Sequence, residues 1–174
     1  MTFNATSPHI KRCLDAGLVQ RIPLRPRAKP VRAILTWPEI NRMLDGTDQH
    51  LGFPERLADK LIGIFIAGHY ITLSQKSARD VDLEKLEKVD EVWSLCFRAP
   101  RPGWRLLGRF VEPGVFVGLK LYDRNELGDI PTYTEKAKCI ITEWSAQLNI
   151  DPFRADDLGS YVGGVFRDVD QPEE

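Results

Sequence analysis

Between Glu91 and Tyr122 the sequence holds three segments in which apolar and polar residues alternate, separated by two turn signals. The segments are Val92–Phe97, Trp104–Val111 and Val115–Tyr122, and the turns are Arg101-Pro-Gly103 and Glu112-Pro-Gly114. Alternation with a period of two residues is typical of β-strands, and Pro-Gly pairs mark turns. Strands joined by such short turns pair antiparallel. The segment therefore predicts a three-stranded antiparallel β-meander.

The alternation also predicts which side chains share a face of the sheet. The side chains expected to face a core are Trp93, Leu95, Phe97, Trp104, Leu106, Phe110, Val115, Val117, Leu119 and Leu121. Arg105 and Arg109 then lie together on the other face of the second strand. Two arginines so placed are either a phosphate clamp or a solvated surface paired with glutamates.

Three helices are predicted before the meander. Ser7-Pro8 has the pattern of an N-cap followed by a first-turn proline, which predicts a short helix over His9–Ala16. Thr36-Trp-Pro-Glu39 has the spacing of a capping box, which predicts a short helix ending at Asp45. A longer helix is predicted over Pro54–Ala67, with an apolar stripe formed by Leu57, Leu61, Ile64 and Phe65.

The residues around the meander complete the expected domain. Tyr70–Leu73 has strand character, whereas Ser74–Asp90 is rich in charge and predicts a surface loop. Thr132-Tyr-Thr-Glu135 has the spacing of a second capping box, which predicts a helix that starts there. The stripe of that helix is Ala137, Ile140, Ile141, Trp144 and Leu148. The fold class expected is α+β, an antiparallel β-meander packed by helices, with extra N-terminal helices.

Charge divides the 174 residues into three parts. Residues 1–52 carry eight Lys/Arg against four Asp/Glu and include the proline-rich stretch 21–30, which predicts a basic, extended arm. Residues 53–148 carry fourteen of each, and residues 149–174 carry two Lys/Arg against seven Asp/Glu. We therefore expect a central α+β domain over 53–148, a basic N-terminal extension, and an acidic tail. Large apolar residues in the tail predict that it docks on the core.

The composition excludes several classes of protein. No apolar run is long enough for a membrane helix, and the first residues lack the pattern of a signal peptide. Three scattered cysteines, Cys13, Cys96 and Cys139, predict neither a disulfide framework nor a metal site. The histidines lie in different segments without ligand spacing. The sequence predicts a cytoplasmic protein without a metal or cofactor.

Four short stretches resemble the RelE/ParE/HigB superfamily of toxins. They are Glu91–Arg98, Pro102–Leu106, Val115–Arg124 and Pro131–Ala137, within a region of about residues 53–148. The resemblance implies a toxin-antitoxin or phage-derived protein with a RelE-like fold. An antitoxin, or the ribosome with its mRNA, is the partner that the resemblance implies.

The ribonucleases of this superfamily cleave mRNA on the ribosome without a metal. The mRNA 2′-oxygen attacks the adjacent phosphate, and fixed cations stabilise the charge that develops. By this resemblance the catalytic positions fall on Arg105, Arg124 and Tyr133. Arg109, Lys120 and Trp104 are further candidates for nucleic-acid contact, the tryptophan by base stacking.

Two departures from the pattern keep other functions open. Ser94 and Cys96 stand where ribonuclease members often carry lysines, so Tyr133 lacks cations that would lower its pKa and make it a general base. ParE-type members share the fold but act on DNA gyrase. The alternatives are a non-catalytic protein- or nucleic-acid-binding module on the same scaffold, covered by the two oppositely charged extensions, and an unrelated α+β protein.

Overall fold

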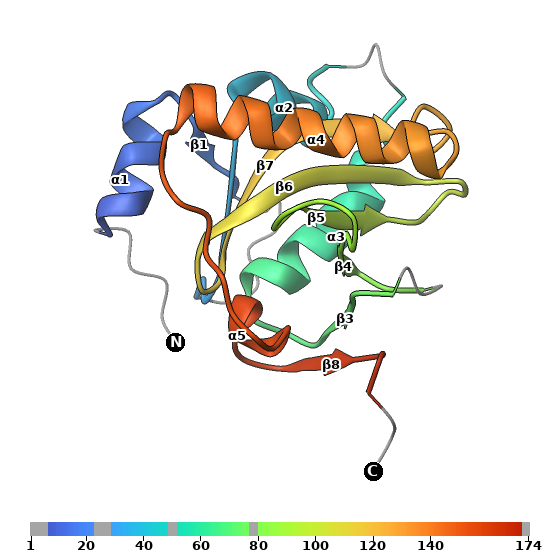
Figure 1. Cartoon of the computed structure of the whole chain (residues 1–174). Coiled ribbons are helices and arrows are strands. Elements are labelled where there is room, and N and C mark those ends of the chain that lie inside the picture. The colour runs from blue at the N-terminus through green and yellow to red at the C-terminus, as the bar shows by residue number, and fades with distance from the viewer. Residues whose placement is uncertain (1–6, 23–28, 49–51, 77–79, 172–174) are drawn as a thin grey trace.

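The computed structural model describes residues 7–22, 29–48, 52–76 and 80–171. Its centre is an eight-stranded sheet with the strand order β1-β2-β7-β6-β5-β4-β3-β8 (Figure 1). The strands are β1 (Val19–Gln20), β2 (Ala33–Thr36), β3 (Ile71–Ser74), β4 (Leu83–Lys85), β5 (Trp93–Phe97), β6 (Trp104–Glu112), β7 (Val115–Asp123) and β8 (Phe166–Asp168). The helices are α1 (Pro8–Asp15), α2 (Pro38–Leu44), α3 (Glu55–Ile66), α4 (Ile130–Gln147) and α5 (Gly159–Val162).

The sheet is mixed. The β1–β2, β4–β5, β5–β6 and β6–β7 pairs are antiparallel, whereas the β2–β7, β3–β4 and β3–β8 pairs are parallel. The predicted α+β class is confirmed, but the sheet is not antiparallel throughout. Segments before residue 53 and after residue 148 supply β1, β2 and β8, so the basic and acidic ends of the chain belong to the same sheet.

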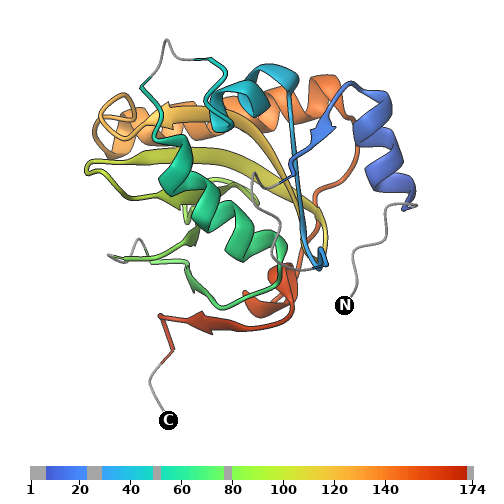
Figure 2. The ribbon, with the colours of Figure 1, turned by 180° about the vertical axis from the view of Figure 1, so that it is seen from behind.

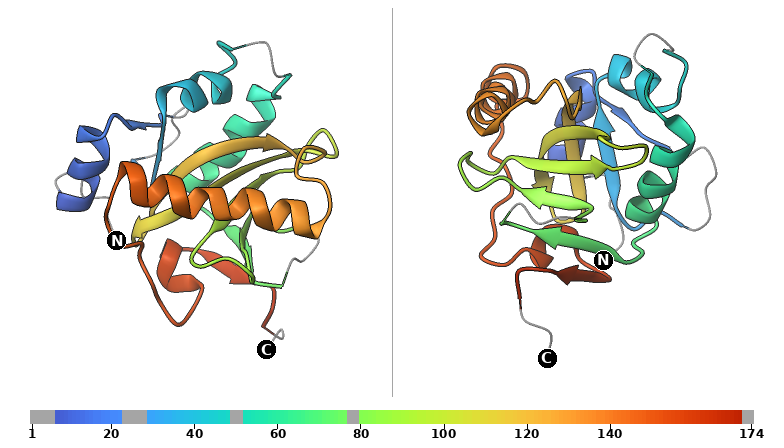
Figure 3. Two further views of the ribbon diagram at one scale, coloured as in Figure 1. Left: turned by 45° about the horizontal axis from the view of Figure 1, so that its top comes forward. Right: turned by 90° about the vertical axis from the view of Figure 1, so that its right-hand side faces the viewer.

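Helices cover both faces of the sheet. Helix α4 lies across one face and α3 across the other, as the view along the sheet shows (Figure 3), and α3 is in front of the sheet when the molecule is seen from behind (Figure 2). Each face has its own buried cluster. Under α4 the cluster includes Leu107, Val117, Ile140 and Trp144, and under α3 it includes Ile62, Phe65, Leu106 and Phe116. Within the described residues, no helix is long and apolar enough to cross a membrane.

A bulge in β7 changes the predicted alternation of that strand. Leu107 pairs with Lys120, but Gly108 pairs with Gly118, so β7 contains one extra residue at this point. As a result Leu121 lies in the cluster under α3, not with Val115, Val117 and Leu119 under α4 as the alternation predicted. A Cβ at Gly108 would lie 1.9 Å from the carbonyl oxygen of Val117, so the close approach of the strands requires glycine.

Of the three predicted N-cap side chains, one is confirmed and two are wrong. Ser7 is the N-cap of α1, and its side chain accepts a hydrogen bond from the amide of His9. Thr36 belongs to β2, and α2 begins after Trp37 without a side-chain cap. Helix α4 starts earlier than its predicted capping box, because Asp129 accepts from the amide of Thr132 and Pro131 occupies the first turn.

The buried stripe of α3 differs from the predicted one. The buried residues are Ala58, Ile62, Phe65 and Ile66, whereas Leu57 is 52% exposed. The sequence offers two overlapping apolar stripes, and the one containing the small Ala58 faces the sheet. A small side chain at this position allows the helix to approach the strands closely. Leu61 and Ile64 flank this stripe and are only partly buried.

The predicted loop Ser74–Asp90 contains strand β4. Val81, Leu83 and Val89 are buried, and β4 pairs with both β3 and β5. Three strand residues are too few to give a periodic signal in the sequence. The strand forms because its neighbours on both sides complete its backbone hydrogen bonds.

Arg32 fixes the C-terminal segment to the body of the protein. Its guanidinium is fully buried and donates to the carbonyl oxygens of Phe65, His69, Val162, Gly163 and Val165. Burial lowers the pKa of Arg32 to about 10, so it stays charged at neutral pH. Most of the predicted extended arm, residues 23–28, lies outside the described residues.

Candidate functional site

Three residues that the sequence singled out gather at one end of the sheet, where the β5–β6 turn meets the β7–α4 loop. The amide of Arg124 donates to the carbonyl oxygen of Gly103 over 2.9 Å, which joins the two loops. Arg105 lies on β6, paired with Cys96 on β5 and with Tyr122 on β7. We call the group Ser94, Cys96, Arg105, Arg124 and Tyr133 the Arg105–Tyr133 site.

Arg124 stacks on Tyr133. The guanidinium carbon of Arg124 lies 5.7 Å from the centroid of the Tyr133 ring, within the range of a cation–π contact. One guanidinium nitrogen donates to the carbonyl oxygen of Gly128 over 3.2 Å. These contacts orient the arginine and place its charge beside the first turns of α4.

Arg105 belongs to the same group of charges. Tyr122 is its partner in the ladder, and the charge of Arg105 acts on Tyr133, the residue whose ring Arg124 contacts. Arg105 donates to the carbonyl oxygen of Trp104 over 3.0 Å. In the described parts of the chain, the ion pairs include neither Arg105 nor Arg124. Both arginines therefore act on Tyr133, and neither has a carboxylate partner among the described residues.

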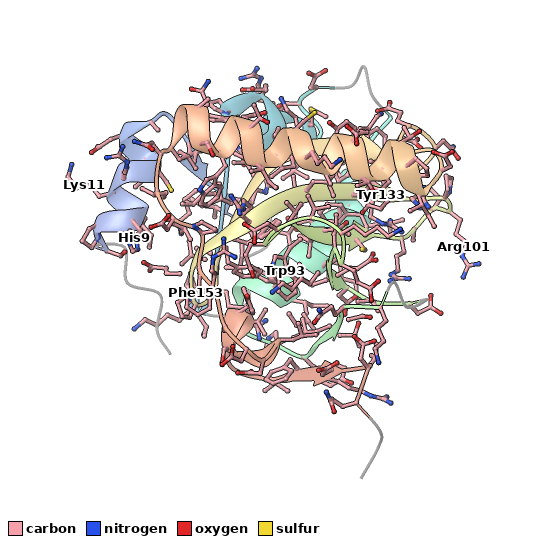
Figure 4. The ribbon with its side chains drawn as sticks, viewed as in Figure 1. His9, Lys11, Trp93, Arg101, Tyr133 and Phe153 are labelled. Carbon is pink, nitrogen blue, oxygen red and sulfur yellow. The ribbon has the colours of Figure 1, made fainter. Side chains whose placement is uncertain are left out.

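Tyr133 has a buried hydroxyl that neighbours the Ser94 side chain, but the contact falls outside ordinary hydrogen-bond geometry. Burial raises the pKa of Tyr133 above its ordinary value, and the nearby Cys96 thiol adds to this shift, whereas Ser94 and Arg105 oppose it. At neutral pH the phenol is fully protonated. It can donate a proton or a hydrogen bond, but it cannot act as the general base that the resemblance implies. In Figure 4, Tyr133 lies beneath α4 and Arg101 points outward at the end of the β5–β6 turn.

The two β5 residues below Tyr133 bring no charge. Ser94 and Cys96 are both buried, and the sulfur of Cys96 lies 3.7 Å from the Ser94 hydroxyl oxygen. Burial also raises the pKa of the Cys96 thiol, so it is not a thiolate at neutral pH. The positive charge of the site comes from Arg105 and Arg124.

A cavity of about 240 Å³ opens beside Tyr133. It is lined by Gln75, Glu84, Leu86, Glu87, Lys88, Val89, Ile130, Tyr133 and Thr134. Ile130, the first residue of α4, is 67% exposed. Glu84 lies on β4 directly across from Ser94, and its charge acts on both Cys96 and Tyr133. The cavity and the Arg105–Tyr133 site therefore share the tyrosine.

The other candidates for nucleic-acid contact lie elsewhere. Trp104 packs edge-on against Phe53 in the cluster under α3, on the opposite face from Arg105. Lys120 forms an ion pair of 2.9 Å with Glu143 of α4, and its hydrogen bond to Glu143 raises the pKa of Lys120. These contacts explain both side chains without a ligand.

Arg109 is also separated from the site. Its side chain is only 3% exposed. It donates to Asp90 over 3.1 Å and lies 5.4 Å from the Trp144 ring. Of the two alternatives for Arg105 and Arg109, neither a shared phosphate clamp nor a solvated surface describes Arg109, because its side chain is buried under α4 and paired with Asp90.

Arg109 belongs to a polar network that the sequence did not indicate, which we call the Tyr161 network. Its members are Lys85, Asp90, Glu91, Arg109, Arg154 and Tyr161. The Tyr161 hydroxyl lies 2.9 Å from the Lys85 nitrogen and donates to Glu91 over 2.7 Å. Arg154 holds both carboxylate oxygens of Asp90, over 2.6 and 2.7 Å.

The Tyr161 network combines distant parts of the chain, which is why no spacing revealed it. One of its members, Glu91, has an unusual backbone conformation. Its φ of 51° is rare for a residue other than glycine. Burial lowers the pKa of Lys85, but its hydrogen bonds to Tyr161 and Glu91 outweigh that effect and raise the pKa above its ordinary value. The network pairs three cations with two carboxylates and includes Arg154 and Tyr161, so it is suited to holding the C-terminal segment in place.

Within the described ranges, no group of three or more His, Cys, Asp or Glu side chains is arranged to hold a metal ion. Comparison with models of known protein families, with curated proteins and with solved structures gave no significant match.

Proposed function

We propose that this chain is a toxin-related protein of the RelE/HigB type that binds RNA by its phosphates in the cytoplasm. Arg105 and Arg124 are the proposed phosphate contacts. One observation carries the proposal: the two guanidinium groups lie on the same face of the sheet and form no ion pair with the described carboxylates.

The chemistry of arginine supports a phosphate as the missing partner. The guanidinium fork matches two oxygens of one phosphate group, and charge-assisted hydrogen bonds of this kind are stronger than neutral ones. Arg105 and Arg124 both act on Tyr133, and an anion bound beside this tyrosine would be attracted by both charges. Arg101, exposed on the adjacent turn, could contact a neighbouring phosphate of the same strand.

Cleavage of mRNA is the activity that the resemblance to RelE/HigB implies. The 2′-oxygen would bond to phosphorus, the bond from phosphorus to the 5′-oxygen would break, and the 5′-oxygen would take up a proton. Arg105 and Arg124 would stabilise the charge on the phosphate. Tyr133 can supply a hydrogen bond or that proton, and the 2′-proton must leave to another base.

The second candidate is a non-catalytic RNA- or protein-binding module on the same scaffold. The protonated state of Tyr133 favours it, because a phenol with a raised pKa does not withdraw a proton at neutral pH. The uncharged Ser94 and Cys96 favour it as well, since the face below α4 gains no cation from β5. An antitoxin would be the partner of either form.

Binding is tested with purified protein and a fluorescent single-stranded RNA, by anisotropy over a series of salt concentrations. We expect Arg105→Ala and Arg124→Ala each to weaken binding about tenfold at low salt and to reduce the salt slope by about 0.7. The control is Arg56→Ala, which removes the same charge from the exposed surface of α3 on the opposite face. Equal affinities for all three variants would refute the proposal.

Activity is tested by inducing the chain in a bacterium and following growth, protein synthesis and mRNA ends by primer extension. Growth arrest with new mRNA ends, both relieved by Arg105→Ala, would establish the ribonuclease. RNA binding without new ends would establish the binding module. Arrest with translation intact would point to a gyrase-type target and would count against RNA as the substrate.

A further inference from the structure

We propose that Lys136 makes a second phosphate contact beside Arg105 and Arg124, so that the site holds two consecutive phosphates of one RNA strand. This inference rests on the proposed function, because the two arginines would hold the neighbouring phosphate of that strand. The Lys136 ammonium lies 4.8 Å from the centroid of the Tyr122 ring, and Tyr122 is the partner of Arg105 in the sheet.

Lys136 is held next to Arg124 by the way α4 packs on the end of β7 (Figure 1). It follows Tyr133 by three residues, and residues three apart on a helix are neighbours on its surface. Tyr133 contacts Arg124, whereas Lys136 contacts Tyr122, which precedes Arg124 by two residues. Two cation–aromatic contacts therefore lie next to each other. We call these four residues, Tyr122, Arg124, Tyr133 and Lys136, the β7–α4 seam.

The Lys136 ammonium has hydrogen-bond donors that its contacts do not use. It donates to the carbonyl oxygen of Glu126, and it forms no ion pair with the described carboxylates. An ammonium group has three donors, so two remain for a phosphate. By contrast, Lys120 on β7 and Lys138 on α4 are each paired with a glutamate. Its contacts with Tyr122 and Glu126 also orient Lys136 before a ligand binds, which lowers the entropic cost of binding.

The seam suits a single strand better than a duplex. Its cations come from positions two residues apart at the end of one strand, a span of at most about 7 Å, and from one turn of one helix. Such a short row of charges follows one sugar-phosphate backbone, whereas proteins that bind duplex RNA contact both backbones across the minor groove. Tyr122 and Tyr133 are partly buried, so their rings position the cations and are not offered to the bases.

Glu126 opposes the proposed contact and therefore provides a test of opposite sign. Burial raises the pKa of Tyr122, and the charge of Glu126 adds to this shift, which places the carboxylate near the ring that Lys136 contacts. Glu126 is exposed, and its charge would repel a phosphate bound to Lys136. Glu126→Gln keeps the backbone carbonyl that accepts from Lys136 and removes only the charge.

The experiment measures binding of the full-length protein to a fluorescent single-stranded RNA by anisotropy over a series of salt concentrations. Lys136→Met removes the charge but keeps a long apolar side chain. It should weaken binding about fivefold at low salt and reduce the salt slope by about 0.7, whereas Lys136→Arg should restore the slope. Lys138→Met is the matched control, because Lys138 is an exposed lysine of the same helix that is paired with Glu135. It should leave the salt slope unchanged.

Two further variants test the position of the second phosphate. Arg124→Ala combined with Lys136→Met should reduce the salt slope by about 1.4, because each cation meets its own phosphate. A reduction of only about 0.7 would mean that both cations hold the same phosphate, which overturns the second contact. Glu126→Gln should strengthen binding by up to about threefold at low salt, and weaker binding would count against a phosphate at Lys136.

The outcomes separate this inference from the proposed function. If Lys136→Met binds RNA like the unaltered protein while Arg105→Ala binds more weakly, the second contact is overturned and the proposed function stands. Equal losses in Lys136→Met and Lys138→Met would show a general attraction of charges and would also overturn it. Tighter binding of a duplex of the same sequence overturns the single strand. If no variant of Arg105, Arg124 or Lys136 weakens binding, the proposed function fails together with this inference.

Discussion

Two tyrosines with buried hydroxyls occupy opposite situations in this molecule. The hydroxyl of Tyr161 contacts Lys85 and Glu91 and accepts from the amide of Ala155. The hydroxyl of Tyr133 is equally hidden from solvent, but its contact with Ser94 falls outside ordinary hydrogen-bond geometry. The first hydroxyl is held by several well-formed hydrogen bonds, whereas the second has only this weak contact among the described residues.

Two arginines of β6 repeat this contrast. Arg105 and Arg109 lie four residues apart on the same face of one strand, as the alternation predicted. Arg109 is paired with Asp90 and stacked on Trp144, although its Nε atom has no hydrogen-bond partner among the described residues. Arg105 is half-buried and forms no ion pair with a described carboxylate.

The difference separates stability from function. Groups whose charges and hydrogen bonds are met within the protein stabilise the fold and have little left to offer a ligand. Groups that lack partners contribute little to the fold, and they are the ones able to bind something else. By this criterion the Tyr161 network is structural, and the Arg105–Tyr133 site is the candidate for binding.

The prediction with the largest expected effect replaces Arg105 and Arg109, one at a time, with alanine. We expect Arg109→Ala to lower the free energy of unfolding by about 2–3 kcal/mol, because it removes an ion pair and buried packing on Trp144. Asp90 is 53% exposed and remains paired with Arg154 in this variant. The loss of stability should therefore be smaller than for breaking a fully buried ion pair. Arg105→Ala should change the free energy of unfolding by less than about 0.5 kcal/mol.

Urea unfolding followed by circular dichroism measures both values. The RNA-binding assay supplies the reciprocal result, in which Arg105→Ala loses affinity while a folded Arg109 variant keeps it. The contrast fails if the two substitutions destabilise the protein equally.

The prediction with an intermediate expected effect removes the hydroxyl group of Tyr161 or of Tyr133. Tyr161→Phe should lower the free energy of unfolding by about 1–3 kcal/mol, because Lys85 and Glu91 lose a buried hydrogen-bond partner. Tyr133→Phe should change the free energy of unfolding by less than about 1 kcal/mol, since the hydroxyl that it removes makes only a poorly aligned contact with Ser94. Thermal unfolding of the two variants side by side decides the point, and a clear loss in Tyr133→Phe would show a partner for its hydroxyl.

The sequence predicted those parts of the fold that depend on neighbours in the chain. The strands around Trp93, Trp104 and Val115 were placed closely, since a period of two and Pro-Gly turns are local signals. Strand β4 was missed because only its neighbours in the sheet make it a strand. The start of α4 was missed because the sequence offers both Asp129 and Thr132 as N-cap residues, and their spacing alone does not show that Asp129 is the cap.

The candidate site was predictable only in part, for the same reason. The resemblance pointed to Arg105, Arg124 and Tyr133, and the structure places all three at one end of the sheet. Whether an arginine of β6 is paired depends on Asp90 and Trp144, which lie far from it in sequence or outside its strand. The Tyr161 network and the cavity depend on such distant contacts throughout, so no spacing indicated them.

The prediction with the smallest expected effect concerns stability at low pH. Low pH should affect the paired arginine Arg109, through its partner Asp90, but not Arg105. The hydrogen bond from Arg154 holds the pKa of Asp90 below its ordinary value. A carboxyl whose pKa is lower in the folded protein contributes stability above its unfolded pKa of about 3.9, and that contribution is lost as the pH falls through the folded value. Because Asp90 is half exposed, solvent screening limits the effect to under about 1 kcal/mol.

Unfolding in urea at pH 6, 4 and 3 measures this loss. Asp90→Asn should make the decline between pH 4 and pH 3 shallower than in the unaltered protein, and added salt should shrink the difference. Arg105→Ala should leave the decline unchanged, because Arg105 has no carboxylate partner among the described residues to lose. If Arg105→Ala altered the acid response as much as Asp90→Asn does, an undetected carboxylate would share its charge, and the site could no longer be assigned to an external phosphate.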